Sequence, residues 1–205
     1  IVPLGWWVLE EACRQAVAWQ SEGLPPVVVA INVSASHLVQ PGFITQVLAI
    51  LARTGLAPQW LDIELTESVM MTELEHAMSV VRQLHEAGIQ VSLDDFGTGY
   101  SSLSYLSKFR LSTLKIDRSF VSSLESNPGD VVICRTIVAM ARNLGLKVTA
   151  EGVETEAQRD LLAESGCDLC QGYLISRPVP ADGIRDLLGR QGILPRALPQ
   201  PIVCL

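Results

Sequence analysis

The chain has 205 residues, of which 48% are hydrophobic and 18% are charged, and its formal net charge is −7. This length and apolar content suffice for one domain with a substantial core. The negative charge argues against binding to DNA or RNA polymers, which favours a basic face. No apolar run approaches the length of a membrane span and no signal peptide is visible, so we expect a cytoplasmic domain.

In chain order, the apolar patterns predict helices at residues 5–20, 43–54, 69–87, 131–144, 156–165 and 181–189. They predict strands at residues 27–33, 61–65, 89–93, 113–116, 147–150 and 169–174. Strands that alternate with helices favour an α/β fold with a parallel sheet. The tail from residue 193 contains three prolines, and we expect it to be irregular.

The chain contains five cysteines, an odd number, in apolar surroundings: Cys13, Cys134, Cys167, Cys170 and Cys204. Cys167 and Cys170 have the CxxC spacing, but no second pair of Cys or His accompanies them. A zinc site is therefore not expected. We interpret all five as reduced thiols.

Two adjacent carboxylates, Asp94 and Asp95, stand where the third predicted strand ends, before a loop with two glycines. Neighbouring strand residues point to opposite faces, so two acids here are costly unless the strand turns and a positive group lies between them. A divalent metal ion is the simplest positive group. The alternative is an ordinary turn, in which Asp and Gly are common.

Every predicted strand carries a polar or charged group near its carboxyl end. These groups are Asn32, Glu64, Asp94, Asp95, Lys115, Glu151 and Gln171. In α/β proteins the ligand site lies at the carboxyl ends of the strands, and in a (β/α) barrel several strands converge there. The pattern therefore predicts a single site built from all of them.

The motifs that carry these residues resemble those of EAL domains, in the same order. They are Asn-Val-Ser at 32–34, Glu-Leu-Thr-Glu-Ser at 64–68, Asp-Asp-Phe-Gly-Thr-Gly-Tyr-Ser-Ser-Leu at 94–103, Leu-Lys-Ile-Asp at 114–117, Ala-Glu-Gly-Val-Glu-Thr at 150–155, Gln-Gly-Tyr at 171–173 and Ser-Arg-Pro at 176–178. The resemblance implies a TIM-like (β/α)8 barrel whose first two strands are missing from this chain. The domain would cover residues 1–190, with a C-terminal tail at 191–205.

The resemblance also implies an activity, the hydrolysis of cyclic di-GMP to linear pGpG with two divalent ions, Mg²⁺ or Mn²⁺. One ion would be held by Asn32, Glu64 and Asp94. Asp94 would bridge to the second ion, which Asp95 and Glu151 would complete. Oxygen ligands of this kind are those that such hard cations prefer.

Three residues would take part in catalysis by the same resemblance. Lys115 would contact the attacking water or the phosphate, and its charge favours the hydroxide form of the water. Glu151 has a second possible role as general base, although ion-bound water makes a ligand or orienting role the better fit. Gln171 would hydrogen-bond near the second ion.

Further residues would support the site or bind substrate. The supporting residues are Glu67, Phe96, Gly97, Thr98, Gly99, Asp117 and Glu154. Arg177 and Pro178 would contact the substrate. The segment 95–106 is expected to couple metal binding to formation of a homodimer. A GGDEF or sensory domain is expected upstream, and the parent protein has room there for a membrane anchor.

The chain departs from the family at its start, because the Glu-Ala-Leu motif, whose Glu binds the first ion, is absent. We therefore expect a part of a complete EAL domain in a longer protein, and the alternative is a protein that is itself truncated. The alternatives to a hydrolase are a receptor that binds cyclic di-GMP without cutting it and a dimerisation module.

Overall fold

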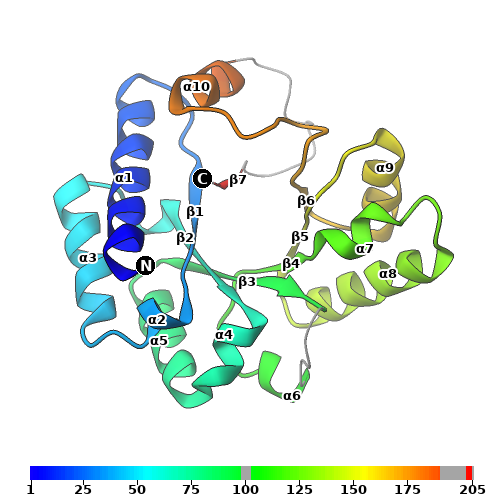
Figure 1. The fold of residues 1–205 in the computed structure, drawn as a ribbon, viewed down its shortest axis with the longest axis horizontal. Helices are drawn as coiled ribbons and strands as arrows, with labels where there is room; N and C mark the ends of the chain where they lie inside the picture. The colour runs from blue at the N-terminus through cyan, green and yellow to red at the C-terminus, as the bar shows by residue number, and fades with distance from the viewer. Residues whose placement is uncertain (98–102, 190–201, 205) are drawn as a thin grey trace. The chain divides into compact units, whose positions relative to one another are not determined.

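The structure, a computed structural model, describes residues 1–97, 103–189 and 202–204 (Figure 1). The chain divides into two compact units. The first consists of Ile1–Val91 and Pro178–Leu205, and the second of Ser92–Arg177. All strand pairs described below are parallel, as the alternation of strands and helices predicts.

In the first unit, strand β1 lies between β2 and β7. Their bounds are β1 Val28–Asn32, β2 Leu61–Thr66 and β7 Ile202–Cys204. Ala30 pairs with Asp62 on one side and with Cys204 on the other. The helices are α1 Val2–Ser21, α2 Ala35–Leu38, α3 Phe43–Thr54, the short 3-10 helix η1 Pro58–Trp60, α4 Glu67–Thr72, α5 Leu74–Glu86 and α10 Ala181–Gly189.

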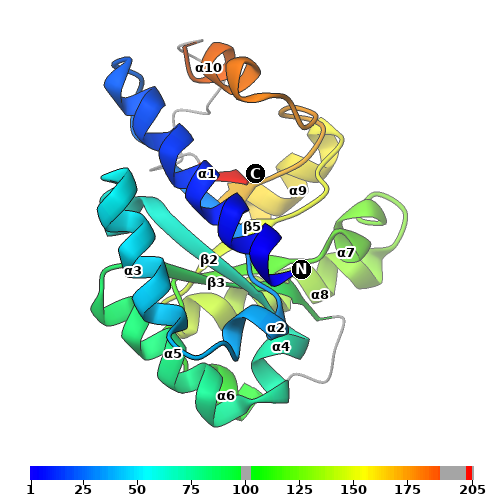
Figure 2. The same cartoon turned by 60° about the vertical axis from the view of Figure 1, so that its left-hand side comes forward.

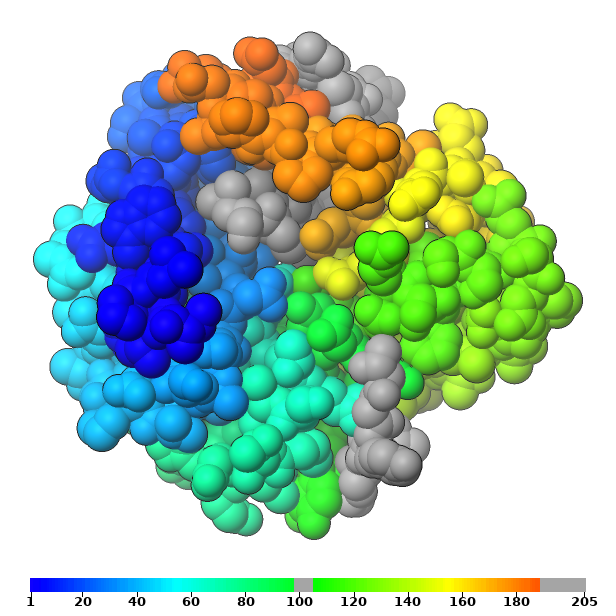
Figure 3. Space-filling view, viewed as in Figure 1, coloured from blue at the N-terminus to red at the C-terminus, as the bar shows by residue number. Residues whose placement is uncertain are grey.

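Helix α1 packs against both α3 and β1, and the views in Figures 1 and 2 show α1 and α3 side by side. Leu9 and Trp19 of α1 are buried. Near its start, the carbonyl oxygen of Val2 lies 2.7 Å from Nε2 of the buried His37, whose Nδ1 lies 3.0 Å from the Ser34 hydroxyl. These bonds hold α1 against α2, while the first turns of α1 stay at the surface (Figure 3).

The second unit contains four strands in the spatial order β3, β4, β5, β6. Their bounds are β3 Gln90–Phe96, of which residues 92–96 belong to this unit, β4 Thr113–Ile116, β5 Lys147–Ala150 and β6 Leu169–Cys170. The helices are α6 Leu103–Leu106, α7 Arg118–Ser122, α8 Pro128–Asn143 and α9 Glu156–Ser165. Helix α8 packs on β4, β5, α7 and α9.

Three expectations about the elements are corrected by the structure. The helix predicted at 69–87 is two helices, because the backbone of Glu73 leaves the helical region (φ −132°, ψ 59°) between α4 and α5. The strand predicted at 169–174 ends at Cys170, where Gly172 turns against Val153. The tail is not wholly irregular, since Ile202–Cys204 forms β7.

The turn after β6 requires glycine at position 172. A Cβ atom there would lie 2.2 Å from the carbonyl oxygen of Val153 and 2.3 Å from its nitrogen, and backbone cannot yield as a side chain does. Gly172→Ala is therefore expected to lower the free energy of unfolding by about 3 kcal/mol or more, measured by urea denaturation.

Gly145→Ala is the matched control for this change. Gly145 also has a positive φ of 75°, but nothing lies within 4 Å of its Cβ position, so only backbone strain of about 1–2 kcal/mol is expected. Equal losses in the two variants would show that the close approach to Val153 does not matter.

Candidate metal centre

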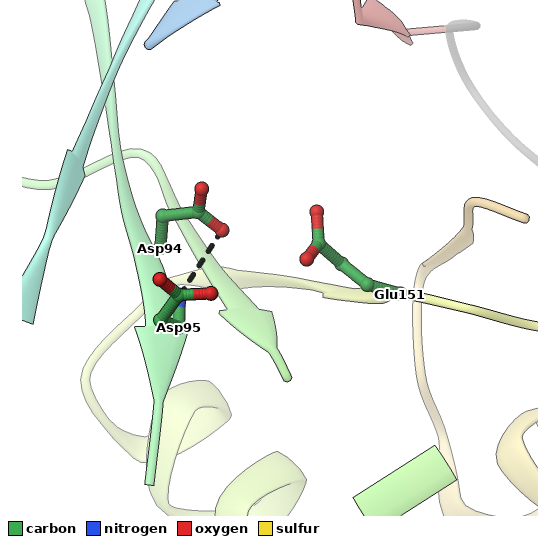
Figure 4. A group of neighbouring side chains, drawn as sticks. All are labelled: Asp94, Asp95 and Glu151. Atoms are coloured by element: carbon green, nitrogen blue, oxygen red, sulfur yellow. Dashed lines mark hydrogen bonds between the residues drawn. The ribbon is translucent and has the colours of Figure 1, made fainter. Parts of the chain in front are cut away.

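The end of β3 is bulged at the two adjacent carboxylates. Leu93 pairs with Leu114 and Phe96 pairs with Ile116, so Asp94 and Asp95 together stand opposite one residue of β4. Asp95 adopts a left-handed backbone with φ 55°, and its N–H donates to Oδ1 of Asp94 at 3.0 Å (Figure 4). The strand therefore turns at Asp94 and Asp95, as the two adjacent carboxylates in the sequence indicated.

The positive group among these carboxylates is Lys115 of β4. Its Nζ lies 3.3 Å from Oδ1 of Asp94 and 2.6 Å from Oε1 of Glu151. The side chains of Lys115, Asp94 and Glu151 are only 5%, 10% and 18% exposed. An ion pair this deeply buried is costly to form unless each charge keeps its partner, so these three groups depend on one another.

One carboxylate oxygen from each of Asp94, Asp95 and Glu151 lies within 4.8 Å of the other two (Figure 4). With Lys115 protonated, three carboxylates leave a net charge of −2 in the cluster. Burial, and then the charges of Asp94 and Asp117, raise the pKa of Asp95, against a smaller opposing effect of Lys115. A hard divalent cation, which prefers several carboxylate oxygens, fits this donor set and its charge.

Backbone hydrogen bonds extend the ladder past β5 and β6 and fix the residues that follow them. Glu151 N donates to the carbonyl of Ile116 at 3.1 Å, and Gln171 N donates to the carbonyl of Ala150 at 2.8 Å. Val153 N donates a hydrogen bond to the carbonyl of Gln171 at 3.0 Å. The predicted residues Glu151 and Gln171 are therefore held on adjacent segments, at the carboxyl ends of β5 and β6.

Asn32, Glu64 and Glu67 lie in the N-terminal part of the first unit. Asn32 and Glu64 are partners in the pairing of β1 with β2, and Asn32 Nδ2 donates to Oε2 of Glu64 at 3.1 Å. Glu64 is buried, at 1% exposure, and Glu67 is buried at the start of α4. Among the described residues, Oε2 of Glu67 has no hydrogen-bond partner.

The predicted supporting residues of the second unit are placed as follows. Phe96 is buried at the end of β3, and Gly97 lies against the ring of Phe120, which a Cβ would approach to 2.8 Å. Asp117 caps α7 by accepting from Ser119 N at 2.9 Å. Thr98 and Gly99 lie outside the described residues.

The remaining three predicted residues are exposed. Glu154 precedes α9, and its N–H donates to Oε1 of Gln158. The guanidinium of Arg177 lies over the ring of Tyr173, 4.4 Å from its centroid. Pro178, the first residue of the returning segment of the first unit, is exposed as well.

Gln158 is a positioning residue that the sequence analysis missed. Its buried Oε1 accepts from the N–H groups of Glu154 at 2.8 Å and Thr155 at 3.1 Å, and Thr155 Oγ1 in turn accepts from Gln158 N. This capping box fixes the turn that follows Glu151. Its signal was present, since a Thr followed three residues later by Gln is typical of such a helix start.

The parallel strands and the acidic cluster at their carboxyl ends place this chain among the α/β proteins that bind their ligands at the carboxyl ends of the strands. The EAL domain family model matches residues 1–178, and the chain belongs to this family. The predicted fold class, a TIM-like α/β domain of the EAL type, is confirmed.

The chain is similar to the bifunctional diguanylate cyclase/cyclic di-GMP phosphodiesterase MucR of Pseudomonas aeruginosa, at 44% identity over 89% of this chain and 27% of that protein. It also matches the EAL domain of Mycobacterium smegmatis DcpA (43% identity, TM-score 0.88, 92% of this chain and 84% of that one). A manganese and cyclic di-GMP complex of Klebsiella pneumoniae BlrP1 matches at 31% identity and TM-score 0.78, over 86% and 45% of the two chains.

The chain spans only 27% of the length of its curated relative MucR. In the part of the chain that the structure describes, no helix combines the length and hydropathy needed to cross a membrane.

Proposed function

We propose that this chain hydrolyses one phosphodiester bond of cyclic di-GMP and releases linear pGpG. The observation that carries the proposal is the cluster of Asp94, Asp95 and Glu151 around the buried Lys115, in a chain of the EAL family. The similarity to a named cyclic di-GMP phosphodiesterase supports the choice of substrate.

We propose two divalent ions, Mg²⁺ or Mn²⁺, as cofactors. Asp94, Asp95 and Glu151 offer the oxygens for one ion, and the manganese complex of BlrP1 supports this choice of metal. By the family resemblance, Asn32, Glu64 and Asp94 would hold the other ion. When bound, such ions supply an activated water and neutralise charge on the phosphate and the leaving oxygen.

The side chains of this chain have separate tasks in the proposal. The ammonium of Lys115 holds the attacking water and stabilises it as hydroxide. Glu151 orients that water and the Lys115 ammonium, to which it is bonded at 2.6 Å. The amide of Gln171 hydrogen-bonds the same water, and Arg177 binds the substrate from its exposed position. Water adds to phosphorus, the P–O3′ bond breaks, and the 3′ oxygen takes up a proton.

The test is chromatographic detection of pGpG from cyclic di-GMP with Mg²⁺ or Mn²⁺. This chain is compared with a version extended upstream to include a Glu-Ala-Leu motif. Turnover that appears with metal and disappears with a chelator supports the proposal. Turnover only in the extended form would show that binding of the first ion requires the added Glu.

Two negative outcomes lead to different functions. No turnover in either form, with cyclic di-GMP still bound, would replace the hydrolase by a receptor. Failure to bind the nucleotide with metal present would leave a dimerisation module.

We further propose that the chain acts as a cytoplasmic homodimer through the region 95–106, downstream of a GGDEF or sensory domain in its parent protein. Size-exclusion chromatography with light scattering, with and without Mn²⁺, tests the dimer. A monomer at all concentrations and metal levels would refute it.

A further inference from the structure

Two cysteines lie at the start and the end of the β6 segment, Cys167 before the strand and Cys170 within it, and the proposed hydrolysis uses neither of them. Cys167 lies in the turn between α9 and β6, and Cys170 is the last residue of β6. Both residues are partly exposed, whereas Cys13 and Cys134 are buried. A small reagent in solution therefore has access to Cys167 and Cys170 ahead of Cys13 and Cys134.

The turn that carries Cys167 is fastened to β5. Asp168 N donates to the carbonyl of Val148 at 3.0 Å, and Oδ2 of Asp168 accepts from Val148 N at 2.8 Å. The Cys167 thiol points back into this turn, 3.4 Å from the carbonyl oxygen of Val148 and 3.2 Å from that of Leu169. The bend at Asp168 turns the chain between the two cysteines, and the Leu169 carbonyl that the Cys167 thiol contacts belongs to the peptide bond before Cys170.

The two thiols differ in reactivity. A hydrogen bond from Cys167, aided by the guanidinium of Arg159 and opposed by burial, lowers the pKa of Cys170. The same hydrogen bond, together with burial, raises the pKa of Cys167. Because the thiolate is the nucleophile, Cys170 is assigned as the attacking sulfur. Cys167 is the second thiol, which then attacks the mixed disulfide formed on Cys170.

We propose that Cys167 and Cys170 are a redox-active pair that closes to an intramolecular disulfide by exchange with a low-molecular-weight disulfide. The sulfur of Cys170 attacks the small disulfide, forms a mixed disulfide and releases one small thiol. The sulfur of Cys167 loses its proton, attacks the sulfur of Cys170 and releases the second small thiol. The protein gives up two electrons and two protons, which the two released thiols carry.

Closure would act on the segment that positions Gln171. Cys170 stands opposite Ala150 in the β5–β6 pairing, one residue before Gln171. To bond with Cys170, the Cys167 sulfur must leave the carbonyl oxygens of Val148 and Leu169. The redox state of the pair is therefore coupled to the backbone at the carboxyl end of β6.

The test exposes the full, reduced chain to glutathione buffers of increasing oxidised fraction, followed by acid quenching, alkylation and tryptic mass spectrometry. Both cysteines fall in the peptide 160–185, because trypsin does not cut between Arg177 and Pro178. We expect this peptide to lose two hydrogens and to escape alkylation as the buffer becomes oxidising. Cys134, whose pKa burial raises to about 11, should remain alkylatable after denaturation.

Single variants separate the two sulfurs. Cys167→Ser should stop at a glutathione adduct on Cys170, and Cys134→Ser should close the pair as the parent does. A parent chain that keeps glutathione on Cys170, or leaves both thiols alkylatable in the most oxidising buffer, overturns the proposal. If Cys167→Ser does not fold, the peptide of the parent chain alone decides.

Discussion

Replacing Lys115 by Ala is expected to reduce the turnover of cyclic di-GMP by about 100-fold or more, the range that a positioned catalytic group supplies. The change also removes the ammonium group that is paired with the carboxylates of Asp94 and Glu151. Breaking a buried ion pair on one side costs about 3–5 kcal/mol, so the metal-free variant should unfold at lower urea concentration.

Added Mn²⁺ should restore more stability to the Lys115→Ala variant than to the parent, because the metal then supplies the missing positive charge. Lys147→Ala is the matched control, since Lys147 is exposed at the start of β5. Turnover of Lys115→Ala near the parental rate would remove this lysine from the mechanism. Unchanged stability without metal would show that the pair contributes nothing to the fold.

Glu151→Gln is expected to lower turnover by about 100-fold to 10,000-fold while leaving the fold intact. The amide keeps the size of the side chain and one oxygen acceptor, but it removes the charge that Lys115 faces at 2.6 Å and an anionic metal ligand. Stopped assays for pGpG measure the loss, and calorimetric titration with Mn²⁺ measures the weaker metal affinity.

Glu156→Gln provides the control for charge, because Glu156 lies five residues further along and its side chain is 77% exposed. It should leave both turnover and metal affinity unchanged. A Glu151→Gln variant with parental turnover and weakened metal binding would be inconsistent with the proposed orienting role. Parental metal affinity would exclude Glu151 as a ligand.

The regular elements followed from the sequence where the local signals agreed. Helix α3 and strands β4 and β5 have the predicted bounds, and Gly55 and Gly166 end their helices in the left-handed conformation. The break at Glu73 was missed because the apolar spacing continues through it. The early end of the strand predicted at 169–174 was missed because the approach of Gly172 to Val153 joins residues distant in the sequence.

The candidate site was predictable in its residue types and in its edge of the sheet, because parallel strands deliver their following residues to one side. Its internal arrangement was not. The sequence predicted a positive group near Asp94 and Asp95 but did not identify it. The structure shows that Lys115, placed by the pairing of β4 with β5, forms ion pairs with both Asp94 and Glu151. Gln158 acts through backbone atoms, which residue types do not reveal.

At Asp95 the backbone conformation that lowers folding stability belongs to the residue that supplies a carboxylate to the acidic cluster. Asp tolerates this conformation better than most side chains but less well than Gly, at a cost on the order of 1 kcal/mol. A glycine there would relax the bulge and delete a carboxylate in the same step. In a lineage released from the need for the acidic cluster, residue 95 is thus a place where losing the site would bring a gain in folding free energy.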